Sequence, residues 1–435
     1  MIRRPPFSRL RGKRWPLLLL LLAAASSALF ADELTPLDPP DTERFLRWGP
    51  FRVRPGLTIP GLGYDNNVFA VTDQTAAANS AAKVGDYYIA LAPRLEGLVL
   101  FGHSAFLTFE ESLEFYAYAS QTELDYFNQF GKARLTIPFR KVGIFWDLGF
   151  DRTRDRPYDA QDIRPVRKYY PLGLGLITKF GWRTDSELGV FSNRYTAEDP
   201  DAIPPPTNCS GLNCYSIAQL NNRTEEGIRF KFRYLAVGRT RLLLELAERQ
   251  IKFNDAAVAL SRNGEERRQL IGVDFGLGGS IYGTFRVGHA DFSLASPSAT
   301  GFNGPVADIA LGYNFGGSGS HLSFTGARDV RYTIYDATPL YLYTGGDLSF
   351  VKYFNRFIGA EVGAGRAVLD FLGDPQNRVD HDTNVILGVR FRFSENDLGR
   401  KVEYAFRYTR WIVNSTRDDL DQNRGTVGFG VTFGY

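Results

Sequence analysis

The sequence has few of the residues that hold metals. Among its 435 residues there are two cysteines, four histidines and one methionine. The histidines stand far apart, and a zinc-type site needs several such ligands together, so we expect no metal and no cofactor. The two cysteines, Cys209 and Cys214, stand close together after the Pro-rich stretch 202–206. In an exported chain this spacing favours a local disulfide that braces a loop.

Long hydrophobic runs are missing beyond residue 31. No stretch there approaches the roughly 18 apolar residues that a membrane-spanning helix requires. Residues 1–31 have a pattern of their own, in which six basic residues precede the apolar run 17–25 and small residues follow it. This pattern predicts a secretory signal peptide over 1–31, cleaved between Ala28 and Asp32.

A large excess of charge of one sign is missing too. The formal net charge of the whole chain is +3. It becomes −3 without the predicted signal peptide, because 45 basic and 48 acidic residues remain when six of the 51 basic residues are removed. A protein that binds nucleic acid needs a basic surface, so nucleic acid is not an expected partner.

Nothing divides the remaining chain into domains, since it has no linker and no low-complexity tract. Its composition, with 44 Gly, 34 Phe and 22 Tyr, favours strands punctuated by glycine. An exported chain without a membrane helix can still be integral to a membrane, but only as a closed β-barrel that satisfies its own backbone hydrogen bonds.

Apolar and polar residues alternate along many segments of about ten residues, as in strands between lipid and a water-filled lumen. In 227–234, apolar residues at the even positions alternate with Arg229, Lys231 and Arg233. We therefore predict an all-β fold, a transmembrane antiparallel up-and-down barrel of about 18 strands, or 16 to 20 if one hairpin is missed or invented. The predicted strands are 54–68, 86–97, 104–118, 124–139, 142–154, 168–180, 184–196, 223–235, 239–252, 265–277, 280–290, 306–315, 320–332, 339–351, 356–369, 382–394, 400–412 and 424–435.

The connections between these strands alternate between short turns and long segments. Outer-membrane barrels have short periplasmic turns and long outer loops. The predicted organisation is therefore a signal peptide (1–31), a short periplasmic segment (32–53) and a barrel (54–435) with 197–222 as its longest extracellular loop.

The end of the chain provides a second indication of the same class. Gly430, Phe433 and Tyr435 lie on a final strand with alternating aromatic residues. This ending resembles the terminal signal read by the bacterial barrel-assembly machinery. That machinery, outer-membrane lipid and lipopolysaccharide are the expected partners, and the oligomeric state stays open.

The polar face of the predicted strands is rich in arginine and lysine, which we expect to line the lumen. Charged rings in a narrow pore set ion preference, so basic stripes predict a preference for anions or acidic sugars. The expected pore-lining basic residues are Lys132, Arg134, Lys179, Arg229, Lys231, Arg233, Arg241, Arg249, Arg286, Arg390, Arg392, Lys401 and Arg407. The alternative interpretation is a neutral wall network, in which they pair with Glu110, Glu114, Asp147, Asp151, Glu245, Asp274, Glu361 and Glu403.

One short segment, Asp380-His381-Asp382, contains residue types used in acid-base catalysis. No serine stands convincingly near a histidine, and an acidic outer loop is as easily a solvated surface. We therefore expect no catalytic residues and no enzymatic activity.

Two short segments carry a resemblance to a known family. Residues 54–59 (RPGLTI) and 63–69 (GYDNNVF) resemble the opening of the β-barrel porin 2 family of bacterial outer-membrane proteins. The resemblance implies a porin-like channel for solutes. Related barrels are often associated with exopolysaccharide or capsule export, so it also admits polymer passage together with polysaccharide export components. The alternative is a structural or adhesive barrel without transport, plugged by an inward-folded 197–222.

Overall fold

The computed structural model describes most of the chain after residue 36. The described residues are 37–40, 42, 45–74, 76, 83–102, 104–154, 164–199, 215–276, 280–316, 319–335, 338–395, 401–417 and 420–434. The predicted signal peptide and the predicted cysteine pair, Cys209 and Cys214, lie outside these residues, as does Tyr435.

All 18 predicted strands are present, each with bounds within four residues of those expected. They are β2 (Phe51–Asp65), β3 (Asp86–Phe101), β4 (Ala105–Tyr118), β5 (Tyr126–Pro138), β6 (Val142–Thr153), β7 (Val166–Lys179), β8 (Thr184–Glu198), β9 (Arg223–Val237), β10 (Thr240–Phe253), β11 (Gly264–Phe275), β12 (Ile281–Leu294), β13 (Phe302–Asn314), β14 (His321–Tyr332), β15 (Leu340–Tyr353), β16 (Ile358–Phe371), β17 (Val379–Glu395), β18 (Lys401–Ser415) and β19 (Gln422–Gly434).

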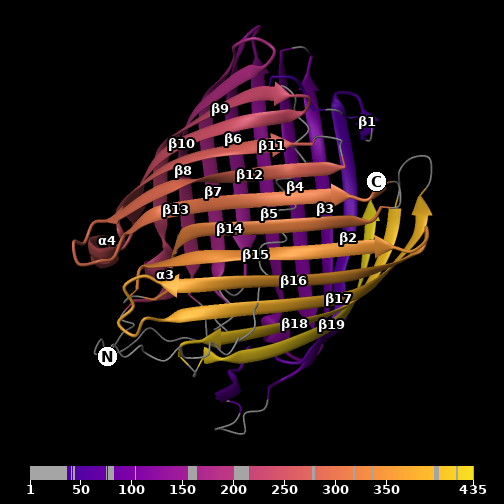
Figure 1. Cartoon of the computed structure of the whole chain (residues 1–435), viewed down its shortest axis with the longest axis vertical. Coiled ribbons are helices and arrows are strands. Elements are labelled where there is room, and N and C mark those ends of the chain that lie inside the picture. Colours follow the sequence, from indigo (N-terminus) through magenta and orange to yellow (C-terminus); the bar gives the residue numbers. More distant parts are fainter. Residues whose placement is uncertain are drawn as a thin grey trace, which may run out of the picture.

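These strands form one closed antiparallel barrel. Each strand from β2 onward pairs with the next, and the ring closes where β19 pairs with β2, from Thr426 opposite Asp65 to Phe433 opposite Leu57. Figure 1 shows the strands running around the barrel, with the C-terminus at the end opposite to helices α3 and α4. The predicted all-β up-and-down barrel of 18 strands is therefore confirmed.

The predicted boundary between a periplasmic segment (32–53) and the barrel is wrong by a few residues. The first barrel strand begins at Phe51, and an additional short strand, β1 (Leu46–Trp48), pairs with residues 51–53 of β2. Gly49 lies in the turn between them with a φ of +57°, a conformation that favours glycine. The chain thus enters the wall through a small hairpin.

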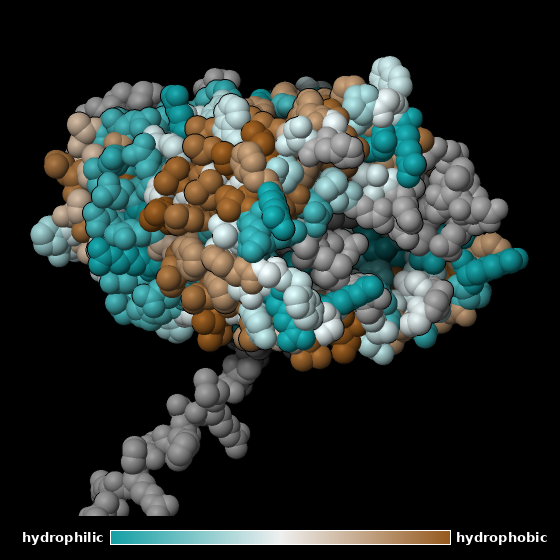
Figure 2. All heavy atoms as spheres, turned by 90° about the horizontal axis from the view of Figure 1, so that it is seen from above, coloured by the Kyte–Doolittle hydropathy of each residue, from teal (hydrophilic) through white to brown (hydrophobic). Residues whose placement is uncertain are grey.

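The outer face of the wall is apolar. On β6, the side chains of Val142, Ile144, Trp146 and Leu148 point outward and are each at least 36% exposed, whereas Phe145 between them is 2% exposed. Figure 2 shows brown hydrophobic side chains over the middle of the face in view and a hydrophilic zone to their left, toward the end that carries α4. An apolar band of this kind is what a barrel presents to lipid.

Among the described residues, three short helices lie in the connections. They are η2 (Thr122–Leu124), α3 (Ile217–Asn221) and α4 (Ala256–Arg262). Within the described ranges, none of the helices is long and apolar enough to cross a membrane.

Candidate functional site

Basic side chains predicted to line the lumen do point into the barrel. Arg134 on β5 lies 3.6 Å from Glu187 on β8, and Arg268 on β11 lies 2.6 Å from Asp329 on β14. Contacts that skip two intervening strands are possible only on the concave inner side of a barrel wall. Because side chains alternate between the two faces of a strand, every second residue counted from these four also lies on the inner face.

On β9 and β10, the inward basic residues are surrounded by carboxylates. Arg233 lies 2.5 Å from Asp185, and Arg249 lies 2.6 Å from Glu225 and also contacts Glu266. This part of the wall has five acidic partners. Glu245 was expected from the sequence, and the other four were not; they are Asp185, Glu187, Glu225 and Glu266.

A second network joins β16, β17 and β18. Arg390 donates two hydrogen bonds to Glu361 (3.0 and 2.9 Å) and also contacts Glu403. Arg407 lies 2.7 Å from Glu361, and Arg392 lies 3.8 Å from Glu403. Both carboxylates are those that the sequence suggested as neutralising partners.

The remaining predicted basic residues follow the same trend. Lys132 lies 2.7 Å from Glu110, Arg134 lies 2.6 Å from Asp147, and Lys179 lies 3.3 Å from Asp38. Arg241 stands opposite Asp274 in the register of β10 and β11, and the side chain of Lys401 is outside the described part. The predicted basic stripes are therefore largely a neutral wall network.

Three basic side chains on β9 and β12 are more loosely paired than most of the network. Arg229 is 3.8 Å from Glu187, Lys231 is 3.9 Å from Glu245, and Arg286 is 3.8 Å from Glu245. These separations exceed hydrogen-bond length. The other two basic partners of Glu187 each have a closer carboxylate, because Arg134 lies 2.6 Å from Asp147 and Arg233 lies 2.5 Å from Asp185. Arg229, with 37% of its side chain exposed, is the most accessible of the three.

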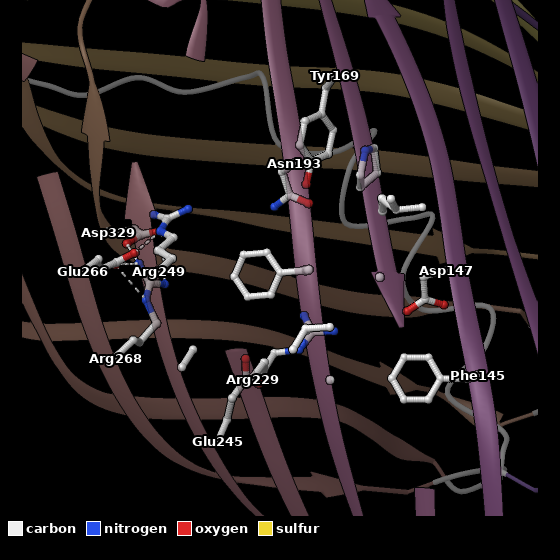
Figure 3. Close-up of a pocket in the computed structure, with 17 residues that line it drawn as sticks. Phe145, Asp147, Tyr169, Asn193, Arg229, Glu245, Arg249, Glu266, Arg268 and Asp329 are labelled. Carbon is white, nitrogen blue, oxygen red and sulfur yellow. Dashed lines mark hydrogen bonds and ion pairs between the residues drawn. The ribbon is translucent and has the colours of Figure 1, made fainter. Parts of the chain in front are cut away.

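A cavity of about 330 Å³ lies beside this group, with Arg229 and Glu245 among its lining residues. One side is aromatic and comes from β6, β7 and β8, with Phe145, Tyr169 and Phe191. The other side is charged and comes from β9 to β11 and β14. Figure 3 shows Arg249, Arg268, Glu266 and Asp329 gathered on that side, across from Asp147 and Phe145.

The outer half of the β14–β15 hairpin separates from β13 and bends into the lumen, while β15 stays paired with β16 as far as Tyr341 opposite Phe371. Pairing of β13 with β14 ends at Ala307 opposite Arg328, although β13 begins at Phe302. The Pro305 carbonyl accepts a hydrogen bond from Arg328 Nε (3.0 Å), so this residue faces β14. Because proline has no N–H to donate, the ladder cannot continue through position 305.

Burial confirms that this part of the hairpin is inside. Leu340, Tyr341, Leu342 and Tyr343 are consecutive and are 0, 6, 8 and 6% exposed, so both faces of β15 are covered here. One face packs on inward apolar residues of β10–β13, together with Leu220 of α3 and Val258 of α4. The other members of this first cluster are Val330, Leu340, Leu342, Ile251, Phe253, Leu270, Ala290, Phe292, Phe302 and Val306. The other face packs on β16 in a second cluster that contains Tyr341, Tyr343, Ala367, Leu369 and Phe371. The hairpin therefore narrows the outer mouth above the cavity.

The Asp380-His381-Asp382 segment does not bring its histidine and its aspartates together on one face. All three residues lie on β17, where neighbouring side chains point to opposite faces, so His381 points away from the two aspartates. The Asp380 carboxylate is buried and bound by Arg378, with the closest contact at 2.5 Å. Among the described residues, no group of three or more His, Cys, Asp or Glu side chains could hold a metal ion.

Helix α4 next to the hairpin has a pH-sensitive cap. Asp255 accepts hydrogen bonds from the Val258 and Ala257 N–H groups, and these bonds, with one from the Gln219 side chain, lower its pKa. A lowered pKa means that the cap stabilises the loop above the ordinary pKa of aspartate and loses this effect as the pH falls through the lowered value.

We therefore predict that Asp255→Ala destabilises α4 by about 1 kcal/mol, while Asp255→Asn keeps most of the cap and removes its pH dependence. Hydrogen exchange of the 256–262 amides, measured in both variants between neutral and acidic pH, checks this. Equal exchange in the Ala and Asn variants at neutral pH would contradict it.

A closed barrel with an apolar outer wall and a charged lumen is the architecture of a membrane β-barrel protein. No family model matches this chain, and a comparison with curated proteins found no match. Similar solved structures include OccK9 (OpdG) from Pseudomonas aeruginosa, with 10% identity and a TM-score of 0.47, over 88% of this chain and 98% of that one.

Two further solved structures are similar to this chain over the same share of its length. A BenF-like porin from Pseudomonas fluorescens has 8% identity and a TM-score of 0.46, over 88% of this chain and 99% of its own. OccAB3 from Acinetobacter baumannii has 10% identity and a TM-score of 0.46, with the same coverage. At these values the likeness carries no argument about transport, which must be argued from the lumen of this chain.

Proposed function

We propose that this chain is a porin-like channel of the bacterial outer membrane that lets small, preferentially anionic solutes diffuse across. An 18-stranded barrel is wide enough for an aqueous passage, whereas about eight strands would be filled by side chains. The signal peptide predicted over 1–31 and the apolar outer band support this location.

The preference for anions rests on one observation, the loosely paired Arg229, Lys231 and Arg286 beside the cavity. Elsewhere on the described inner wall, the expected basic residues that form ion pairs lie within 3.3 Å of a carboxylate, except Arg392, which lies 3.8 Å from Glu403. Only a small part of the predicted stripes is therefore available to attract a passing anion. Passage of an exopolysaccharide is supported by the family resemblance alone.

A plugged structural barrel is the second candidate, and the inward hairpin favours it. The predicted plug was the loop 197–222, whose residues 200–214 lie outside the described part. Its helix α3 packs Leu220 against the same apolar cluster as the hairpin. In this alternative, the hairpin and α3 together close the outer mouth.

Solute uptake distinguishes the two candidates. Liposomes containing the purified full chain should swell in solutions of small solutes, and faster with a monosaccharide acid than with the neutral sugar of the same size. Liposomes without protein provide the baseline. Swelling at the baseline rate, from preparations shown to contain folded barrel, would favour the plugged scaffold.

A further inference from the structure

We propose that Arg262 is the positioning residue that holds the β14–β15 hairpin in its inward position and so sets how far the outer mouth is closed. This inference rests on the proposed channel function. It concerns a residue of α4, outside the cavity and outside the inner face of the barrel strands.

Arg262 is fully buried, with 0% of its surface exposed, although arginine is almost never buried completely. Its guanidinium group donates to carbonyl oxygens on two other segments. Nη1 lies 2.8 Å from the Thr333 carbonyl and 3.5 Å from that of Leu220, and Nη2 bonds to the Tyr335 carbonyl. In return, the Tyr332 hydroxyl donates to the Arg262 carbonyl at 2.7 Å.

These bonds join three neighbouring outer connections at one side chain. Thr333 and Tyr335 belong to the connection between β14 and β15, Leu220 to α3, and Arg262 to α4. The hairpin connection is also bonded within itself, because the Thr333 hydroxyl contacts the carbonyls of Tyr335 and Thr338. It can therefore be held or released as one piece.

The barrel wall fixes this part of the hairpin on one side only, because β15 stays paired with β16 as far as Tyr341 opposite Phe371. Beyond Arg328, β14 has no pairing with β13 because the ladder ends at Pro305. The lower part is anchored by Arg268, which lies 2.6 Å from Asp329. Above that point, the ladder with β16 and a hydrogen bond from the Thr338 hydroxyl to Asp374 (3.2 Å) hold the β15 side, and apolar packing and the Arg262 bonds hold the free edge of β14. Apolar packing is not directional, so on this free edge the bonds of Arg262 are what specify one position.

Removing the guanidinium leaves three carbonyls without this donor, two of them in the hairpin. The loss of one such bond shifts an equilibrium by about tenfold. We therefore expect Arg262→Ala to populate a more open mouth, seen as larger or longer-lived high-conductance levels. Arg262→Met, which keeps an apolar stem of similar length, should behave in the same way.

The experiment is single-channel recording of the full chain in planar bilayers, comparing wild type, Arg262→Ala and Arg262→Met. Arg267→Ala is the matched control, because Arg267 is a nearby arginine with 66% of its side chain exposed. Time spent in the highest conductance level should rise about tenfold in both Arg262 variants and stay at the wild-type value in the control. Heat-dependent electrophoretic mobility shows whether each barrel is folded.

A further variant, with 334–338 replaced by two glycines, distinguishes failure of the role of Arg262 from failure of the proposed channel function. If this protein conducts more than wild type while the Arg262 variants do not, the channel stands and the role of Arg262 is overturned. If folded wild type, Arg262 variants and the shortened protein all fail to conduct, the proposed channel function itself is wrong. Should the Arg262 variants fail to fold, Tyr332→Phe removes the return bond to Arg262 and should raise the same readout; an unchanged readout would count against the proposal.

Discussion

Replacing Arg390 and Arg392 with glutamate together should prevent the barrel from folding rather than change its selectivity. From the sequence, these two arginines are a natural choice for testing an anion-attracting stripe. In the structure, however, Arg390 bridges Glu361 and Glu403, which are 7 and 21% exposed. The double substitution would place four carboxylates together on the inner wall, and among the described residues Arg407 would remain as an ion-pair partner of Glu361.

The loss of one partner from a buried ion pair costs about 3–5 kcal/mol, a large part of the stability of a typical protein. The measurement is urea unfolding of the refolded barrel, followed by the heat-dependent shift in electrophoretic mobility. Arg410→Glu is the control, because Arg410 on the neighbouring strand β18 is exposed. Exchanging the charges with Arg390→Glu and Glu361→Arg should recover part of the lost stability. A double variant as stable as wild type would show that the network does not hold the wall.

The second large effect is expected at Arg229. Arg229→Glu should lower the ratio of anion to cation permeability by about tenfold or more. A unit charge about 8 Å from a passing ion contributes about 2 kcal/mol at an effective dielectric constant near 20, and reversing its sign doubles the change. Salt screens part of this effect, so it should shrink as ionic strength rises.

Reversal potentials in a salt gradient measure this ratio. Glu245→Gln is the opposing variant, since it removes the acid shared by Lys231 and Arg286 and should raise anion preference. Arg267→Glu is the control for charge on the outside of the barrel, because Arg267 is 66% exposed. Identical reversal potentials for wild type and Arg229→Glu would remove the basis for an anion preference.

The strands could be predicted from the sequence because lipid and water impose a strict period of two on each of them. The apolar Ile228 and the charged Arg229 each indicate by their own chemistry whether they face lipid or the lumen, without information from the rest of the chain. The closed barrel then follows, since only closure satisfies the backbone of every strand in a membrane. The strand count needed no information on side-chain contacts.

The partners of the inward charges could not be predicted in the same way. Alternation shows that Arg134 points inward, but not that it reaches Glu187 three strands further along the chain. Such distances depend on strand tilt and barrel curvature, which a one-dimensional pattern does not contain. For this reason a balanced wall network resembled a set of basic stripes.

The inward hairpin did leave a signal in the sequence. Residues 339–343 read Pro-Leu-Tyr-Leu-Tyr, without the polar positions that a strand between lipid and water requires. A continuous apolar run indicates a strand covered on both faces, as Leu340 and Tyr341 are. Its packing partners, including Leu220 of α3, again came only from the three-dimensional arrangement.

Single-channel conductance of the purified full chain in a planar bilayer tests the central claim most directly. A porin-like channel predicts discrete, ohmic steps with a reversal potential on the anion side in a salt gradient. A folded barrel that produces no steps, both as wild type and with residues 334–338 replaced by two glycines, would contradict a conducting lumen.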